Sequence, residues 1–120
     1  MNVKVILTTL LFSMSSLALA VESVRSIPPA FHGKWSEKIE DCTQDGEGNV
    51  TVSRKALAGY ENYGAVKKVT VNGPLDIVVF SKNSGEGETW ESTRRFRLSP
   101  DKKVLSDITY KEPYVFLRCP

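Results

Sequence analysis

The chain has 120 residues, of which 41% are hydrophobic and 25% are charged, with a formal net charge of +2. This length suits one domain of ordinary size, and the charged fraction is that of a globular protein rather than of a disordered tail. The near balance of acidic and basic residues argues against nucleic acid as a partner, because phosphate binding needs a clustered excess of lysine and arginine.

The first 20 residues have the pattern of a secretory signal peptide. Lys4 supplies a positive charge, residues 5–12 are mostly apolar, and Ala18-Leu19-Ala20 offers the small side chains that signal peptidase requires. We therefore expect residues 1–20 to be removed and residues 21–120 to fold as a single β domain in the periplasm or outside the cell. We expect no membrane span after the signal is removed.

The segment that follows is predicted to be an extended arm and a short strand. Residues 21–30 contain Ile27-Pro28-Pro29, which cannot lie inside a helix or a central strand. Residues 33–35 are predicted to form a short strand.

Cys42 and Cys119 are the only thiols. Two cysteines in a small exported domain usually pair, and the Cys-x-x-Cys spacing of redox-active pairs is absent, so we predict a Cys42–Cys119 disulfide. A straight strand would carry Cys42 about 23 Å from Trp35, whereas a helical turn spans about 10 Å. We therefore predict a short helix or tight turn over Ser36–Cys42, with Ser36 as its N-cap, to keep the cysteines together.

From residue 49 onward, apolar and polar residues alternate with a period of two and turn signals interrupt the pattern. Because all links are short, each strand should pair antiparallel with the next. We expect an all-β fold, an antiparallel up-and-down meander of seven or eight strands forming a small barrel, with a two-layer β-sandwich as the alternative. The predicted strands are residues 49–54, 57–63, 65–72, 75–82, 88–98, 104–110 and 114–119.

No catalytic or metal-binding constellation is apparent, so we expect a non-catalytic protein without a cofactor. His32 is the only histidine and has no serine or cysteine beside it in the sequence. A zinc site needs three or four ligands, which one histidine and two oxidised cysteines do not supply. Residues 41–46 match the start of a calcium-binding loop, but Val52 stands where a bidentate carboxylate is needed.

Arg94 is the most informative polar residue of the predicted strands. Alternation places it on the inner face with Trp90 and Phe96, and a charge that points inward needs a partner. The same alternation places Glu61 on the inner face of its predicted strand, so Glu61 is the candidate partner of Arg94. Three interpretations stay open: an internal Glu61–Arg94 salt bridge, a bulge that turns Arg94 outward, and an arginine that anchors an anionic ligand inside the barrel.

The segment Phe31-x-Gly33-x-Trp35 resembles the G-x-W signature of lipocalins and related barrels. In that family the tryptophan closes one end of the barrel and packs on an arginine of the last strand, so the resemblance assigns these structural roles to Trp35 and Arg118. The chain is much shorter than a typical lipocalin, which argues against a roomy pocket. Its whole pattern also resembles small exported proteobacterial proteins of unassigned function.

The preferred function is a non-catalytic binding protein that acts on a secreted or periplasmic protein, as an inhibitor or immunity-type factor does. Small exported β-barrels with one disulfide resemble bacterial lysozyme inhibitors in size and build. The acidic loop at residues 84–90 is the candidate contact, because Glu86 and Glu88 would meet a basic partner and Trp90 would anchor it.

The alternative is a lipocalin-like carrier of a small molecule, which we consider less favoured. A cavity smaller than about 300 Å³ would exclude a typical drug-sized ligand. The side chains that would surround such a ligand are those of Tyr60, Tyr63, Arg94 and Tyr110.

Overall fold

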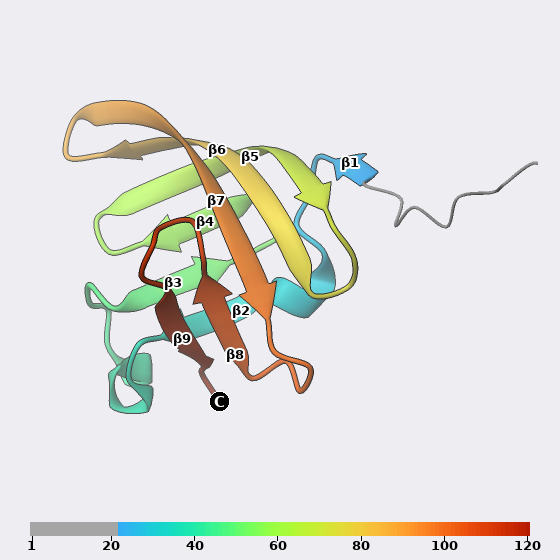
Figure 1. The fold of residues 1–120 in the computed structure, drawn as a ribbon. Coiled ribbons are helices and arrows are strands. Elements are labelled where there is room, and N and C mark those ends of the chain that lie inside the picture. Colours follow the sequence, from blue (N-terminus) through green and yellow to red (C-terminus); the bar gives the residue numbers. More distant parts are fainter. Residues whose placement is uncertain (1–21) are drawn as a thin grey trace, which may run out of the picture.

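The computed structural model describes residues 22–120, so the predicted signal peptide lies outside the described residues. Eight antiparallel strands, β2 to β9, form a closed barrel, and β1 is an additional strand (Figure 1). Each barrel strand pairs with the next in sequence and β9 returns to β2, so the predicted meander and barrel are confirmed and the sandwich alternative is wrong. The strands are β1 (Glu22–Val24), β2 (Gly33–Ser36), β3 (Asn49–Val52), β4 (Ala56–Gly59), β5 (Asn62–Val71), β6 (Asp76–Gly85), β7 (Glu88–Leu98), β8 (Val104–Asp107) and β9 (Tyr114–Arg118).

The predicted arm is extended only in part, and it contributes to the core. Strand β1 pairs with β5, with Val24 opposite Val69. A short 3-10 helix, η1 (Pro29–Phe31), follows, and the two prolines lie just before it and at its first position. Ile27 and Phe31 are each 1% exposed, so this segment fills one end of the barrel.

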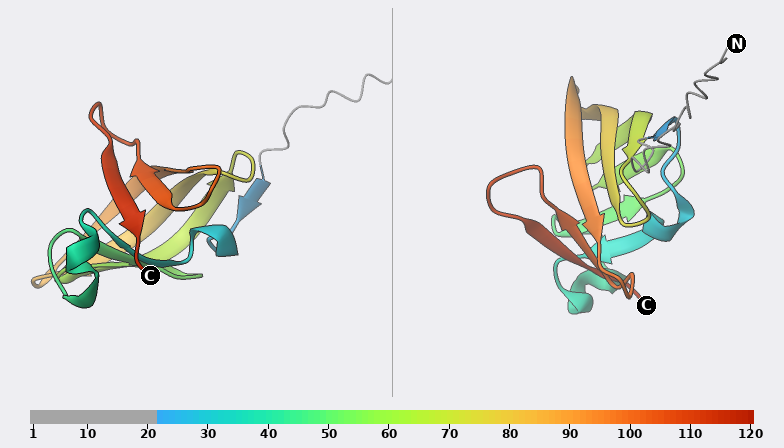
Figure 2. Two further views of the ribbon diagram at one scale, coloured as in Figure 1. Left: turned by 90° about the horizontal axis from the view of Figure 1, so that it is seen from below. Right: turned by 45° about the vertical axis from the view of Figure 1, so that its right-hand side comes forward.

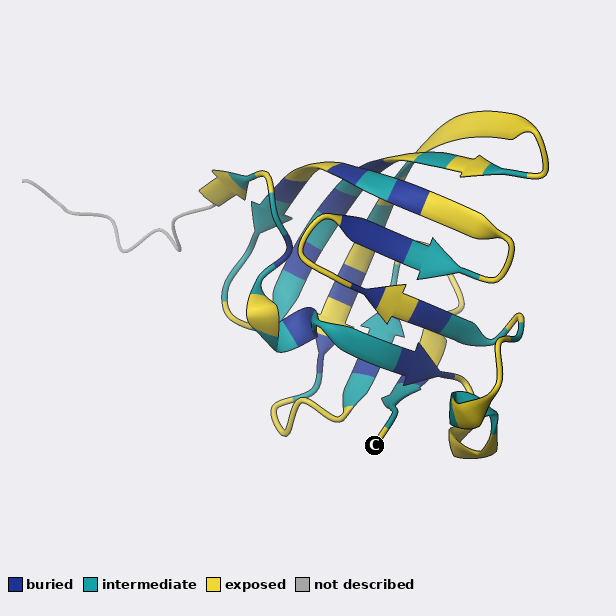
Figure 3. Cartoon of the chain, turned by 180° about the vertical axis from the view of Figure 1, so that it is seen from behind, coloured by how far each residue is buried: buried dark blue, intermediate teal, exposed yellow. Residues whose placement is uncertain are grey.

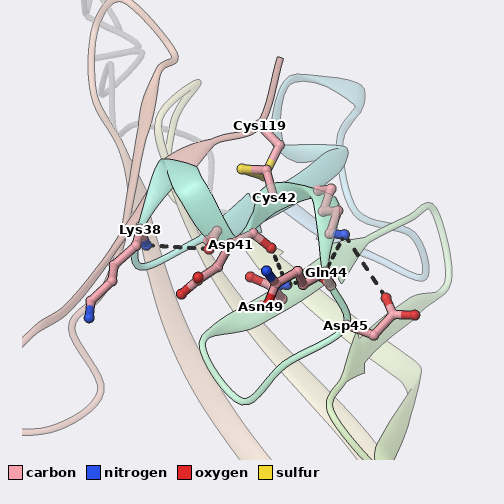
Figure 4. The surroundings of a disulfide bond; sticks show 9 residues. Lys38, Asp41, Cys42, Gln44, Asp45, Asn49 and Cys119 are labelled. Carbon is pink, nitrogen blue, oxygen red and sulfur yellow. Dashed lines mark hydrogen bonds and ion pairs between the residues drawn. A yellow bond between two sulfur atoms is a disulfide. The ribbon is translucent and has the colours of Figure 1, made fainter.

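The disulfide and the compact turn before it are confirmed. After β2 the chain forms a second short 3-10 helix, η2 (Ile39–Thr43), and Cys42 is bonded to Cys119 with their Cα atoms 5.6 Å apart (Figure 4). The predicted N-cap is wrong, because Ser36 still belongs to β2 and Lys38 occupies the cap position without a side-chain hydrogen bond. The Asn49 amide donates to the carbonyl oxygens of Asp41 and Gln44, which fixes the end of η2 against β3 (Figure 4).

The strand predicted over residues 57–63 is wrong, because the structure has a hairpin turn within it. Strand β4 ends at Gly59 and β5 begins at Asn62, with the turn at Tyr60 and Glu61. Glu61 has a φ of 55°, in the left-handed region that glycine and asparagine usually occupy, so the sequence carried no turn signal at this position.

The hairpin of β6 and β7 is longer than predicted. The connection between the strands predicted over residues 75–82 and 88–98 is reduced to a tight turn, because Asn83 pairs with Trp90 and Gly85 with Glu88. The tip of this hairpin is exposed, whereas the buried positions lie in the body of the barrel (Figure 3).

The end of the barrel next to η1, which we call the closed end, is filled by Trp35. Its ring is fully buried, and its indole N–H donates to the carbonyl oxygen of Phe31 at 3.0 Å. The guanidinium carbon of Arg118 lies 4.1 Å from the centroid of the Trp35 ring, which is the contact that the resemblance to lipocalins implies.

The Arg118 guanidinium also ties separate segments together. It donates to the carbonyl oxygens of Lys102, His32 and Ala30, at distances of 2.8, 2.7 and 2.8 Å. A planar fork of N–H groups makes these three bonds while its face stacks on the indole, an arrangement that a lysine ammonium cannot reproduce.

We predict that Arg118→Lys lowers the free energy of unfolding by about 2 kcal/mol, because charge-assisted hydrogen bonds and the stacking are lost. Chemical denaturation of the protein without its signal peptide measures this change. Arg54→Lys, an exposed arginine, is the control and should change stability by less than about 0.5 kcal/mol. Equal effects of the two substitutions would show that the Arg118 fork does not stabilise the barrel.

An ion-pair cluster lies on the outer face of the β6–β7 hairpin. Asp76 accepts hydrogen bonds from Arg95 Nε and Nη2, at 3.1 and 2.8 Å, and from Arg97 Nη2 at 3.2 Å. The pKa of Asp76 lies below its ordinary value of 3.8, chiefly because Arg95 hydrogen-bonds the ionised carboxylate, although partial burial opposes the shift.

Since the pKa of Asp76 is lower in the folded state than in the unfolded state, the ionised carboxylate stabilises the fold at pH values above the unfolded-state pKa. This stabilisation is lost as the pH falls through the folded-state pKa. We predict that Asp76→Asn is less stable by about 0.5 to 1 kcal/mol at neutral pH and that the difference shrinks as the pH falls below 3.8. Urea denaturation at neutral pH and at successively lower pH values below 3.8 measures it. A difference that persists unchanged at the lower pH values would contradict this role for the carboxylate.

Candidate functional site

The β4–β5 turn and the β6–β7 tip lie on the side of the barrel away from η1 (Figure 1), and residues of both turns line a hollow there. Two adjoining cavities of about 460 and 440 Å³ lie there and share the lining residues Glu47, Asn62, Trp90, Arg94 and Phe116. We call the combined hollow the barrel mouth. Its lining residues are Glu37, Glu47, Asn49, Val50, Leu57, Gly59, Tyr60, Glu61, Asn62, Asn83, Gly85, Glu86, Glu88, Trp90, Ser92, Arg94, Asp107, Tyr110, Tyr114 and Phe116.

All five residues that the sequence predicted for ligand or partner binding line this mouth, namely Glu61, Glu86, Glu88, Trp90 and Arg94. They come together because the β4–β5 turn packs against the β6–β7 tip. A Cβ atom at Gly85 would lie 2.6 Å from the carbonyl oxygen of Glu61, so only glycine permits this approach of the two turns.

The predicted pairing of Arg94 with Glu61 is wrong. The alternation was interpreted correctly, since Arg94 points inward, but its Nε donates to Asp107 Oδ2 at 2.8 Å. Asp107 is 1% exposed, whereas Glu61 lies in an exposed turn. The sequence did hold a signal for this partner, because Asp107 shares the inner face of its strand with Leu105.

Asp107 is held in place by further hydrogen bonds. Its Oδ1 accepts from the backbone N–H of Thr109 at 3.0 Å and from the Thr109 hydroxyl, and that hydroxyl accepts from the backbone N–H of Arg95 at 2.8 Å. The Arg94 side chain is 28% exposed and its guanidinium carbon lies 4.9 Å from the Phe96 ring centroid. The positive charge of Arg94 is therefore neutralised on one side and partly shielded on another.

The remaining charge of the mouth is negative. Its lining carries six carboxylates against the one guanidinium of Arg94, and Asp107 already pairs with that guanidinium. An arginine in this surrounding is a poor anchor for an anionic ligand, because the neighbouring carboxylates repel a second negative charge. The lining carboxylates are those of Glu37, Glu47, Glu61, Glu86, Glu88 and Asp107.

Four aromatic rings stand around the mouth with large exposed fractions. Trp90 is 44% exposed, and Tyr110 and Tyr114 meet edge to face with ring centroids 6.4 Å apart. Tyr60 completes the set, while Tyr63, which was also predicted to surround a ligand, does not line either cavity. Rings and carboxylates around one hollow are the groups that bind ammonium and guanidinium ions, through charge and cation–π contacts.

A polar cluster on β6 and β7 was not predicted from the sequence. The buried Ser81 donates to Asn83 Oδ1 at 2.9 Å and lies 3.2 Å from the Ser92 hydroxyl, which also accepts from Asn83 Nδ2 at 2.8 Å. Asn83 and Ser92 line the mouth, so its inner wall is polar and internally hydrogen-bonded. The inward positions of both residues in the alternating pattern were the available signal.

His32 lies apart from the mouth, with Nε2 2.6 Å from the carbonyl oxygen of Ile27, to which it donates. In residues 22–120 no three His, Cys, Asp or Glu side chains are grouped closely enough to hold a metal ion. No helix of this described part is long and apolar enough to cross a membrane. Searches against protein-family models, curated proteins and solved structures found no match to the chain.

We predict that Asp107→Ala lowers the free energy of unfolding by about 2 to 3 kcal/mol, because Arg94 and Thr109 lose their shared partner. Glu61→Gln is the matched control and should cost less than about 0.5 kcal/mol, since Glu61 lies in an exposed turn. Thermal or urea denaturation compares the two. A larger loss for Glu61→Gln would restore Glu61 as the partner of Arg94.

Proposed function

We propose that this protein is an exported, non-catalytic binding protein whose barrel mouth holds a positively charged group of its partner. The observation that carries the proposal is the lining of the mouth, in which six carboxylates and four exposed aromatic rings surround one paired arginine. Because this lining is acidic although the whole chain has a formal net charge of +2, the negative charge is concentrated at the mouth. A local field of this kind steers oppositely charged groups and raises their rate of association.

A protein partner is favoured over a small molecule because several charged and aromatic residues that line the mouth are exposed. Glu61, Glu86, Glu88 and Trp90 are all exposed, so a partner surface can meet them directly. Tryptophan is enriched among the residues that contribute most to the affinity of protein–protein interfaces. This supports an inhibitor or immunity-type factor that receives a lysine or arginine side chain from its target.

A carrier of a small cationic molecule is the second candidate, and the size of the cavity favours it. The larger hollow of about 460 Å³ exceeds the volume below which a drug-sized ligand does not fit. In this function the same carboxylates would neutralise the ligand, and Val50, Leu57 and Phe116 would contact its apolar part.

The exported location is supported by the disulfide as well as by the predicted signal peptide. The Cys42–Cys119 bond joins residues 77 positions apart in the chain. Disulfides of this kind form and persist in the periplasm and outside the cell, where thiols are not kept reduced.

Calorimetric titration with spermine, a small polycation, tests the proposed cation binding. We expect saturable binding that the double substitution Glu86→Gln/Glu88→Gln weakens at least about tenfold, which corresponds to about 1.4 kcal/mol. The control is Glu22→Gln/Glu91→Gln, which removes the same charge from outside the mouth and should have little effect. If spermine does not bind, or if both double variants weaken it equally, the mouth is not a cation site.

A further inference from the structure

Strand β7 has a long edge that no other strand within residues 22–120 covers. It runs from Glu88 to Leu98, but β8 pairs only with Phe96, Arg97 and Leu98. One further backbone bond, from Ile108 N–H to the carbonyl oxygen of Arg95, extends the contact. Between Glu88 and Arg94, β7 is paired on its β6 side alone among the described strands.

The register shows which backbone groups face this uncovered edge. The N–H and the carbonyl of Arg95 both point toward β8, since they bond to Thr109 and Ile108. The pairing of β6 with β7 has no bulge, so the same orientation recurs at every second residue. The backbone N–H and C=O groups of Thr93, Glu91 and Thr89 therefore point out of the sheet edge, ready to bond to another strand.

The side chains of the same stretch connect this edge to the mouth. Glu88, Trp90, Ser92 and Arg94 alternate with the edge-facing residues and line the hollow. The same cavity of about 440 Å³ is also lined by Tyr114, the first residue of β9, and by Tyr110 of the β8–β9 loop, which turns away from β7 (Figure 2, right). A strand placed about 4.8 Å from β7 would thus enter this cavity and direct every second side chain into the mouth.

Building on the proposed function, we infer that the partner supplies an extended polypeptide segment with lysine or arginine at alternate positions, which adds as a strand to the edge of β7 between Glu88 and Arg94. Main-chain hydrogen bonds to Thr89, Glu91 and Thr93 give affinity, and the basic side chains enter the acidic mouth to give specificity. Charge complementarity selects this occupant, because a second copy of the chain would bring a second Glu88 and Glu91 against the first.

The test uses an acetylated peptide of alternating threonine and lysine, about seven residues long. In the inferred pairing its lysines face the mouth and its threonine amides bond to β7. Methylating the threonine nitrogens removes these donors and keeps every charge. We expect the unmodified peptide to bind at least about tenfold more tightly than the methylated one, and to slow amide hydrogen exchange at Thr89, Glu91 and Thr93.

Variants of the protein provide an independent test of the inferred strand pairing. Glu91→Pro removes one edge-facing N–H while leaving the β6 ladder intact, and Glu91→Gln at the same position removes only the charge. We expect Glu91→Pro to weaken the unmodified peptide about tenfold and Glu91→Gln to leave it nearly unchanged.

Three outcomes would overturn the inference. Equal binding of the methylated and unmodified peptides would show that the mouth binds charge without strand addition, so the proposed function would stand while the inference fails. Absence of binding by both the peptides and spermine would remove the proposed function as well. Sedimentation that shows a dimer of this chain, broken by Glu91→Pro, would assign the edge to a second copy.

Discussion

The stacking of Arg118 on Trp35 is the interaction on which the barrel depends, because it lies at the seam where the first and last barrel strands meet. That seam is short, since β2 pairs with β9 only through Trp35 opposite Arg118 and Ser36 opposite Leu117. One more backbone bond, from Cys119 N–H to the carbonyl oxygen of Lys34, and the disulfide from Cys119 to Cys42 reinforce it. A stacked cation, a short ladder and a covalent bond thus close the barrel within a few residues of one another.

Packing of the closed end leaves few apolar side chains to fill the opposite end of the barrel. The largest buried rings, those of Trp35, Phe31 and Phe96, are used in the core. A small domain has a limited apolar content, so the end formed by the hairpin turns remains hollow and polar. Its inner wall is satisfied by hydrogen bonds among Ser81, Asn83 and Ser92, and its rim carries carboxylates and exposed rings. The division between a packed end and an acidic, open end is the physical basis for assigning binding to the mouth.

Much of this arrangement follows from local sequence patterns, and the rest depends on register. Alternation was sufficient to predict the barrel, the inward direction of Arg94 and the face shared with Trp90, because side-chain direction in a strand is a local property. Alternation also places Asp107 on an inner face, but it could not select Asp107 over Glu61 as the partner of Arg94, since that choice depends on the β7–β8 register. The turn at Glu61 was missed because a non-glycine residue adopts a positive φ there. The uncovered edge of β7 is longer than local patterns predict, because β8 ends at Asp107 and not at residue 110.

Amide chemical-shift changes, mapped by NMR while spermine is added to the isotope-labelled protein, test whether the acidic mouth is the binding surface. We expect changes confined to the mouth, at residues such as Glu47, Glu61 and Glu88, with the closed end around Trp35 and Arg118 unaffected. Changes scattered over the outer faces of the strands, or centred on the closed end, would contradict this expectation.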